Sequence, residues 1–198
     1  MHILIESITA NTVPEIGEKE ALTLKEKAQK EYEKLLQENT ADNDAYRKHS
    51  VDYIYPAAAL CIAAKEMEID TAVIVTALRE HFRVTCAADN AVIKRQMKIP
   101  FAYHLVPRFF LSYSLRHYPE EAGFRYRIPK REKGKGAFDI IRCPYLETFK
   151  KYGCPEITTA FCDSDDFTYG DMHPGLVWER KGTLGYGNEC CDFCIREI

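Results

Sequence analysis

The amino-acid sequence predicts an α+β fold, in which an N-terminal helical half packs on a small C-terminal antiparallel sheet with short helices. Two observations lead to this prediction. Between residues 18 and 118, apolar side chains recur every three to four positions, which is the spacing of one helix face. After residue 119, short segments alternate apolar and polar side chains, as strands do. We expect a mainly helical subdomain over residues 1–118 and an α+β subdomain over residues 119–198, joined in one compact domain.

Composition and charge indicate a globular protein and argue against membrane and nucleic-acid-binding proteins. The 198 residues include 27 basic and 30 acidic side chains, and 46% are hydrophobic, which is typical of a globular chain. A net charge of -3 gives no general attraction to nucleic acid or to an acidic membrane. The most apolar stretch, residues 53–64, is too short to span a bilayer, and the N-terminus lacks the pattern of a signal peptide. We therefore expect a cytoplasmic protein with neither a membrane nor a nucleic-acid partner.

The first half contains several expected helices. Residues 1–16 are expected to form a short strand or tail followed by a loop, and residues 18–39 a helix. Residues 41–68 form a second expected helix, with a break or kink at Pro56. Asp70 is a suitable N-cap for a third helix, and residues 89–97 fit a short fourth one. Residues 101–118 have helical periodicity interrupted by Pro107, and His104 and His117 in this segment are expected to be packing or surface residues.

The second half is expected to consist of four strands and two short helices. The strands are predicted at residues 123–128, 137–143, 176–180 and 190–196. Proline and glycine positions predict helices over residues 144–152 and 155–161. Basic residues 130–136 and glycine-rich residues 182–188 are expected to be hairpin turns. This order predicts an antiparallel sheet with helices packed on one face.

Eight cysteines are the most informative feature of the composition, because in a reducing compartment they are expected to be core thiols, metal ligands or catalysts. Cys191 shares a strand face with Phe193, which favours a core thiol. Cys191 and Cys194 have zinc-knuckle spacing, but a strand would direct their sulfurs to opposite faces, so we expect no structural metal. A catalytic metal held by Cys143, Cys162 and His173 remains an alternative.

Cys162 is a candidate nucleophile in an unfavourable setting. Asp163, Asp165 and Asp166 follow it, and the predicted helix ends near it, and both features raise a thiol pKa. His173, Arg142 or Arg180 could offset this effect if the fold brings one of them to the sulfur. Asp165 could instead act as a general base toward water. The alternative without catalysis is an acidic turn that ends the helix.

The C-terminal third resembles the L-2-amino-thiazoline-4-carboxylic acid hydrolase family. The resemblance is carried by RCPYLETFKKYGCPEI, FCDSDD, the His173-Pro174 pair and ERKGTLGYGNECCDF, which together lie within residues 142–193. A looser similarity covers the helical residues 53–83. Three features depart from the pattern without removing a motif residue: Cys194, the doubled Cys190-Cys191 and the added Asp166.

The resemblance implies a hydrolase that opens a cyclic amidine between C2 and sulfur and yields N-carbamoyl-L-cysteine. It implies site residues at Cys143, Cys162, Asp165, Arg180, Cys191 and Asp192. From the chemistry we expect Asp165 as general base or amidinium partner and Cys162 as nucleophile. His173 is a further catalytic candidate. Arg142 or Arg180 would grip the substrate carboxylate, with Thr183 nearby, and either arginine could instead pair with one of the acids. No cofactor is expected.

Two other classes of function stay open. The ending TLGYGNECCDFCIREI is also a little similar to the closing hairpin of vinyl-reductase-like sensor domains. One alternative is therefore a non-catalytic binding domain with an apolar pocket lined by Trp178 and Phe193. A cysteine-ligated metal protein is the other. Phe109, Phe110 and Tyr113 could form a homodimer interface, although we expect them in the core.

Overall fold

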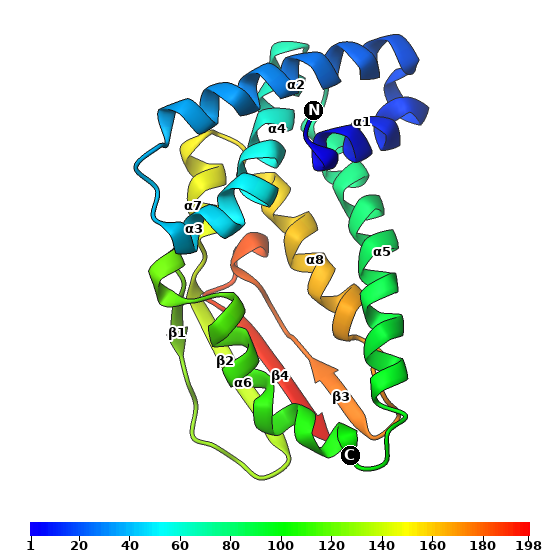
Figure 1. The fold of residues 1–198 in the computed structure, drawn as a ribbon, viewed down its shortest axis with the longest axis vertical. Coiled ribbons are helices and arrows are strands. Elements are labelled where there is room, and N and C mark those ends of the chain that lie inside the picture. Colours follow the sequence, from blue (N-terminus) through cyan, green and yellow to red (C-terminus); the bar gives the residue numbers. More distant parts are fainter. The chain divides into compact units, whose positions relative to one another are not determined.

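The computed structural model describes residues 1–198 and has the α+β fold that the sequence predicts (Figure 1). The α-helices are α1 (Ile3–Ile16), α2 (Glu18–Glu38), α3 (Asp44–His49), α4 (Tyr55–Glu66), α5 (Thr71–Gln96), α6 (Val106–His117), α7 (Pro144–Lys151) and α8 (Thr158–Tyr169). The strands are β1 (Arg125–Arg127), β2 (Lys135–Arg142), β3 (Leu176–Glu179) and β4 (Cys191–Glu197). Short η turns lie at Ser50–Ile54, Ala102–Leu105, Glu120–Ala122, Pro155–Ile157 and Leu184–Tyr186. No helix is both long and apolar enough to cross a membrane.

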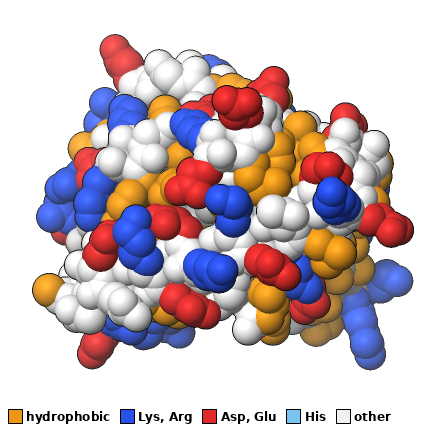
Figure 2. Space-filling view, turned by 90° about the horizontal axis from the view of Figure 1, so that it is seen from above, with side chains coloured by type: hydrophobic (Ala, Val, Ile, Leu, Met, Phe, Trp, Pro, Cys, Tyr) orange, Lys and Arg blue, Asp and Glu red, His pale blue; other side chains and the backbone are white.

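The chain forms two compact units, and it passes from one to the other at three places, inside α5, at the start of α7 and inside α8. One unit contains residues 1–81 and 145–161, and the other contains residues 82–144 and 162–198. The expected division of one compact domain into subdomains at residue 118 stays a prediction. On the face shown in Figure 2, acidic and basic side chains are interspersed rather than gathered by sign.

The first unit is helical, and α4 is its most buried element. Seven consecutive residues from Tyr55 to Cys61 are buried, because the run AAALCIAA is apolar on every side. Helix α2 packs on α4 through the predicted stripe that includes Leu24, Ala28 and Leu35. The predicted helix over residues 18–39 is thus confirmed.

The expectation of a strand near the N-terminus is wrong, because this segment forms α1. His2 caps the helix by accepting the amide N–H of Leu4 on its Nδ1 atom at 3.1 Å. Leu4, Ile5 and Ile8 then form a buried stripe at helical spacing. The apolar positions of this segment thus follow the helical period rather than that of a strand.

Three further boundaries in the first half differ from the prediction. The irregularity near Pro56 is a π turn at Ser50–Ile54, after which Pro56 occupies the first turn of α4. The expected third and fourth helices are one helix, α5, because no glycine or proline interrupts Thr71–Gln96. Pro107 begins α6 rather than interrupting it, since a proline at the first turn loses no helical hydrogen bond.

The second unit contains the antiparallel sheet, with strand order β1-β2-β4-β3. Phe138 on β2 is paired with Phe193 on β4, and Trp178 on β3 stacks on Phe193 at 5.5 Å between ring centroids. Phe110 of α6 and Tyr169 of α8 reach the same rings. The predicted sheet with helices on one face is therefore confirmed.

The aromatic residues proposed for the core divide between core and surface. Phe110 is buried, whereas Phe109 and Tyr113 are exposed. The expectation that all three lie in the core is therefore wrong for two of them, because α6 turns a second apolar face to solvent. His104 and His117 are exposed, as expected, and His104 Nδ1 lies 3.1 Å from a carboxylate oxygen of Glu197.

Candidate active site

Helix α8 carries Cys162 and Asp165 one turn apart in its interior. The sequence analysis expected the helix to end near Cys162, and this expectation is wrong. No glycine or proline interrupts the acidic residues that follow, and the helix continues to Tyr169, where the amide of Gly170 bonds the carbonyl of Asp166 at 2.9 Å. Positions i and i+3 lie on one helix face, so the Cys162 thiol and the Asp165 carboxylate project to the same side.

The glycine-rich segment before β4 joins the antiparallel strands β3 and β4, as expected for a hairpin connection, and contains a 3₁₀ turn at Leu184–Tyr186. Thr183 is 2% exposed, and its hydroxyl accepts the N–H of Tyr186 at 3.3 Å. The Thr183 side chain and the backbone N–H of Gly185 lie near the Cys162 thiol and act to lower its pKa. The next amide along, that of Leu184, donates to Cys191 Sγ at 3.3 Å. The turn after Thr183 therefore lies next to both the Cys162 and the Cys191 thiols.

Arg180 connects the end of β3 to α8. Its guanidinium donates to the carbonyl oxygen of Cys162 at 2.5 Å and to Asp165 Oδ2 at 3.3 Å, and it also forms an ion pair with Asp166. Only 6% of the Arg180 side chain is exposed. Trp178 donates its indole N–H to the other oxygen of Asp166 at 2.7 Å. In this structure Arg180 therefore pairs with the acids of α8, one of the two roles weighed for it.

Burial dominates the electrostatics of these groups. It raises the pKa of Asp165 to about 7, against the opposing charge of Arg180 and with a contribution from Asp166 and Asp163. Burial also raises the pKa of the Cys162 thiol, even though Thr183, the Gly185 amide and Arg180 act in the other direction. The pKa of Cys191 is raised for the same reason. Near neutral pH both thiols are protonated, and Asp165 has a pKa of about 7, so it titrates in this range.

This arrangement can perform acid-base chemistry around neutral pH. A carboxyl group with a pKa near the working pH can accept a proton in one step and return it in the next. The Thr183 side chain and the Gly185 backbone N–H both favour the ionised form of Cys162, so a thiolate formed transiently there would be stabilised. The pKa of the thiol nevertheless stays above its usual range, and the resting group is not an activated nucleophile.

We call Cys162, Asp165, Arg180 and the turn after Thr183 the cluster around Cys162. Two more of the expected site residues, Cys143 and Asp192, lie beside it. Cys143 follows β2, is half-buried and lies close enough to Cys191 to affect its pKa. Asp192 has a structural contact: its Oδ1 accepts the backbone N–H of Lys181 at 2.9 Å and of Gly182 at 2.8 Å. It thereby anchors the turn that begins after Arg180.

His173 and Arg142 have other surroundings. His173 lies before β3, accepts the Gly175 amide on Nδ1 at 3.0 Å and stacks on Tyr103 at 4.2 Å. Arg142 is exposed at the end of β2, opposite Arg125 of β1. The roles of His173 and Arg142 toward Cys162 and Asp165 stay predictions.

The structure also shows the surroundings of the residues considered for a binding pocket and for a metal site. Trp178 and Phe193 pack on Phe110, Phe138 and Tyr169 and so belong to the hydrophobic core of the second unit. Cys191 is buried and Cys194 is half-buried, as expected for alternate positions of a strand. No group of three His, Cys, Asp or Glu side chains is arranged to hold a metal ion.

Three features of the cluster were missed in the sequence. These are the amide donors of Leu184 and Gly185 and the bond from the Tyr186 hydroxyl to Asp163, at 2.8 Å. A backbone amide leaves no mark on residue type, so the only available signal was the position of the GTLGYG run between Arg180 and Cys191.

Comparison with known proteins identifies the family. The family model of L-2-amino-thiazoline-4-carboxylic acid hydrolase matches residues 52–195, which include every residue of the cluster. Searches of curated proteins and of solved structures found no match. Because the matched segment spans most of the 198 residues, the chain belongs to the L-2-amino-thiazoline-4-carboxylic acid hydrolase family.

Proposed function

We propose that this protein hydrolyses a carboxylated cyclic amidine, with L-2-amino-thiazoline-4-carboxylate as the first substrate to test. The observation that carries the proposal is Asp165, a carboxyl group with a pKa of about 7 that lies one helical turn from Cys162. Family membership supports the substrate class. The alternative of a non-catalytic binding domain predicts binding without turnover and is separated by the same assay.

The reaction defines what the residues must do. The oxygen of water adds to C2, and the C2–S bond then breaks. The carbon becomes the carbonyl of a ureido group, one proton of the water goes to the departing sulfur, and the other goes to the ring nitrogen. The product, N-carbamoyl-L-cysteine, has a free thiol that the substrate lacks. Such a reaction needs a base for water, an acid for the sulfur and a cation for the carboxylate.

Asp165 suits the roles of base and acid. In its ionised form it accepts a proton from the attacking water, and it can return that proton to the departing sulfur. Its hydrogen bond to Arg180 is long, at 3.3 Å, so one carboxylate oxygen can turn toward a ligand without losing a strong partner. In this path Cys162 remains a thiol and contacts the substrate, which agrees with its raised pKa.

A covalent path through Cys162 is the second mechanism. The thiol would pass its proton to Asp165, attack C2 and form a thio-linked intermediate that water then hydrolyses. Donors from Thr183 and Gly185 would stabilise the thiolate during this step. The energetic cost is the deprotonation of a buried thiol, and the water path avoids that cost.

Arg142 is the better candidate for holding the substrate carboxylate. Arg180 is buried and occupied by Asp165 and Asp166, whereas Arg142 is exposed and directly precedes Cys143. A planar guanidinium binds a carboxylate through two parallel hydrogen bonds, which lysine cannot reproduce. We expect Arg142→Lys to raise KM at least about tenfold with a smaller effect on kcat.

Thiol release tests the proposal directly. Trace enzyme is incubated with L-2-amino-thiazoline-4-carboxylate, and a disulfide reagent follows the new thiol. We expect turnover in the wild type and a loss of about 100-fold or more in kcat for Asp165→Asn. Cys162→Ala separates the two paths: total loss supports the covalent path, and residual turnover of a few per cent supports the water path.

Two control variants test whether a loss of turnover could come from any substitution in this part of the chain. Cys194→Ala changes a half-buried thiol on β4, and Asp171→Asn changes an exposed acid that pairs with Lys94. Both variants should retain wild-type turnover. Well-folded wild-type protein that releases no thiol would refute this substrate, and binding without turnover would favour the non-catalytic alternative. Metal analysis of protein purified without added metal tests the cysteine-ligated alternative, for which about one equivalent is required.

A further inference from the structure

A hollow in the second unit lies between α6 and the loop that joins β1 to β2. Its volume is about 320 Å³, at the lower end of the range for small-molecule sites. It is lined by Leu111 and Leu115 of α6 and, from the facing chain, by Ile128, Arg131 and Ala137. None of the residues that line it belongs to the cluster around Cys162, so the hollow is a separate site.

Cationic side chains dominate the rim of this hollow. Arg108, Lys130, Arg131 and Lys135 line it, against a single acid, Glu132. Glu132 is bound to Lys135 at 2.9 Å. The other three cations form no ion pair, and Arg108 instead lies over the ring of Phe109 at 5.6 Å. In a chain with a net charge of -3, this concentration of positive charge favours an anionic ligand.

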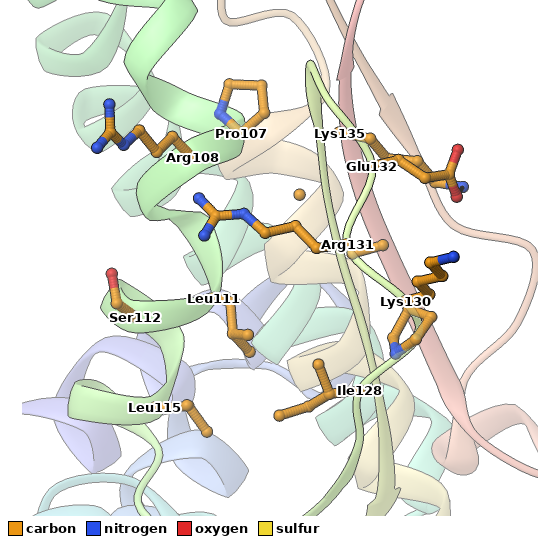
Figure 3. A pocket seen from close by; sticks show the side chains of 13 residues that line it. Pro107, Arg108, Leu111, Ser112, Leu115, Ile128, Lys130, Arg131, Glu132 and Lys135 are labelled. Atoms are coloured by element: carbon orange, nitrogen blue, oxygen red, sulfur yellow. Dashed lines mark hydrogen bonds and ion pairs between the residues drawn. The ribbon is translucent and has the colours of Figure 1, made fainter.

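The wall of the hollow is apolar. Leu111 and Leu115 are half-buried, and Ile128 opposite them is 53% exposed, although it would gain by being covered. Figure 3 shows Leu115 and Ile128 facing each other, with the Arg131 side chain extended toward α6 above them. An occupant would therefore have its charged end near Arg131 and its apolar part between the leucines and Ile128.

A close backbone contact lies among the residues that line the hollow. Gly136 of β2 lies against Pro107 of α6 so closely that an added Cβ would come within 2.3 Å of the Pro107 carbonyl oxygen. This contact fixes the distance between the strand and the helix. This contact holds the start of β2 against α6, and the loop between β1 and β2 supplies Ile128 and the basic side chains of Lys130 and Arg131.

We propose that this hollow binds a small organic carboxylate with an apolar tail. The unpaired cations account for the charge, and the leucine and isoleucine side chains account for the tail. The volume excludes a long chain, and octanoate is a suitable probe. The affinity falls with salt, because the cations are exposed and screened.

Calorimetric titration of the full chain with octanoate at low salt tests the proposal. We expect saturable binding with one equivalent and a Kd of about 1 mM or tighter. Acetate lacks the tail and octanol lacks the charge, so both should bind at least about tenfold more weakly. Equal binding of octanol would overturn the requirement for a carboxylate, and absence of octanoate binding would overturn the proposal. Tighter binding of an acidic peptide such as hexaglutamate than of octanoate would also overturn it.

Variants locate the site. Arg131→Gln should weaken octanoate binding about fivefold or more, because a charge-assisted contact is lost. Ile128→Ser should reduce the difference in affinity between octanoate and acetate. Lys133→Gln is the matched control: it removes a charge from the same exposed loop, at a position that does not line the hollow. An equal loss in Lys133→Gln and Arg131→Gln would show general attraction to the loop and would refute a specific site.

Discussion

Replacing Asp165 with asparagine should stabilise the protein at alkaline pH while it removes the proposed base. Burial raises the pKa of Asp165 from its ordinary value of 3.8 to about 7, so the folded chain holds a proton that the unfolded chain has already released. Ionised Asp165 is consequently a destabilising group. Asparagine has nearly the same shape and no charge to desolvate.

The magnitude follows from the two pKa values. Each pKa unit corresponds to about 1.4 kcal/mol, so ionisation of Asp165 costs the folded state about 4 kcal/mol at most. Since 27% of the side chain is exposed, we expect a measured value of about 2 to 4 kcal/mol. The sign is fixed by the raised pKa: stability is greatest below pH 4, falls as the pH rises toward 7, and is constant above that value.

Urea denaturation of the wild type and Asp165→Asn at pH 4.5 and pH 8.5 measures this effect. The variant should be more stable by about 2 to 4 kcal/mol at pH 8.5 and by less than about 1 kcal/mol at pH 4.5. Asp171→Asn, which changes an exposed acid, should show no such pH dependence. A variant that is less stable than the wild type by the same amount at both pH values would refute the reasoning, because the Arg180 ion pair would then outweigh burial.

Three further predictions concern the same unit. If ionised Asp165 is the base, kcat/KM for thiol release should rise with pH through about 7 and level off, and a rate that falls over this range would contradict the assignment. Asp192→Ala should destabilise the fold by about 2 kcal/mol in urea denaturation and accelerate amide exchange at Gly182, since two backbone amides lose their acceptor. Gly136→Ala should lower stability by about 2 kcal/mol or more, because its Cβ would collide with the Pro107 carbonyl, and an unchanged urea midpoint would show that α6 can move away.

The sequence predicted the periodic elements well and the boundaries poorly. Helix α2 and strands β2 and β4 have long patterns with one clear period, and each lies where expected. Helix α1 was missed because its cap is a histidine ring, which is not a residue type that usually signals a helix start. Helix α8 was ended too early because a run of acids looks like a turn, although only glycine or proline would have forced one there.

The site was predictable in its residues and not in its geometry. Cys162, Asp165 and Arg180 were identified in the sequence, and the structure brings them together. The decisive donors are backbone amides of the turn after Thr183, whose direction depends on a conformation that residue types do not specify. Asp192 was grouped with the catalytic residues, but its two backbone contacts could be seen only in three dimensions.

The three acids of α8 differ in what holds them, and this difference selects Asp165 as the reactive one. Both oxygens of Asp163 accept from the Tyr186 hydroxyl, at 2.8 and 3.0 Å. Asp166 accepts from the Trp178 indole and pairs with Arg180. Asp165 has only the 3.3 Å contact to Arg180, and burial raises its pKa to about 7. A carboxylate with strong hydrogen bonds must lose some of them when it accepts a proton. A carboxylate that is largely buried and weakly hydrogen-bonded is instead stabilised when it accepts a proton. Asp165 is therefore the acid of α8 best placed to act as a base.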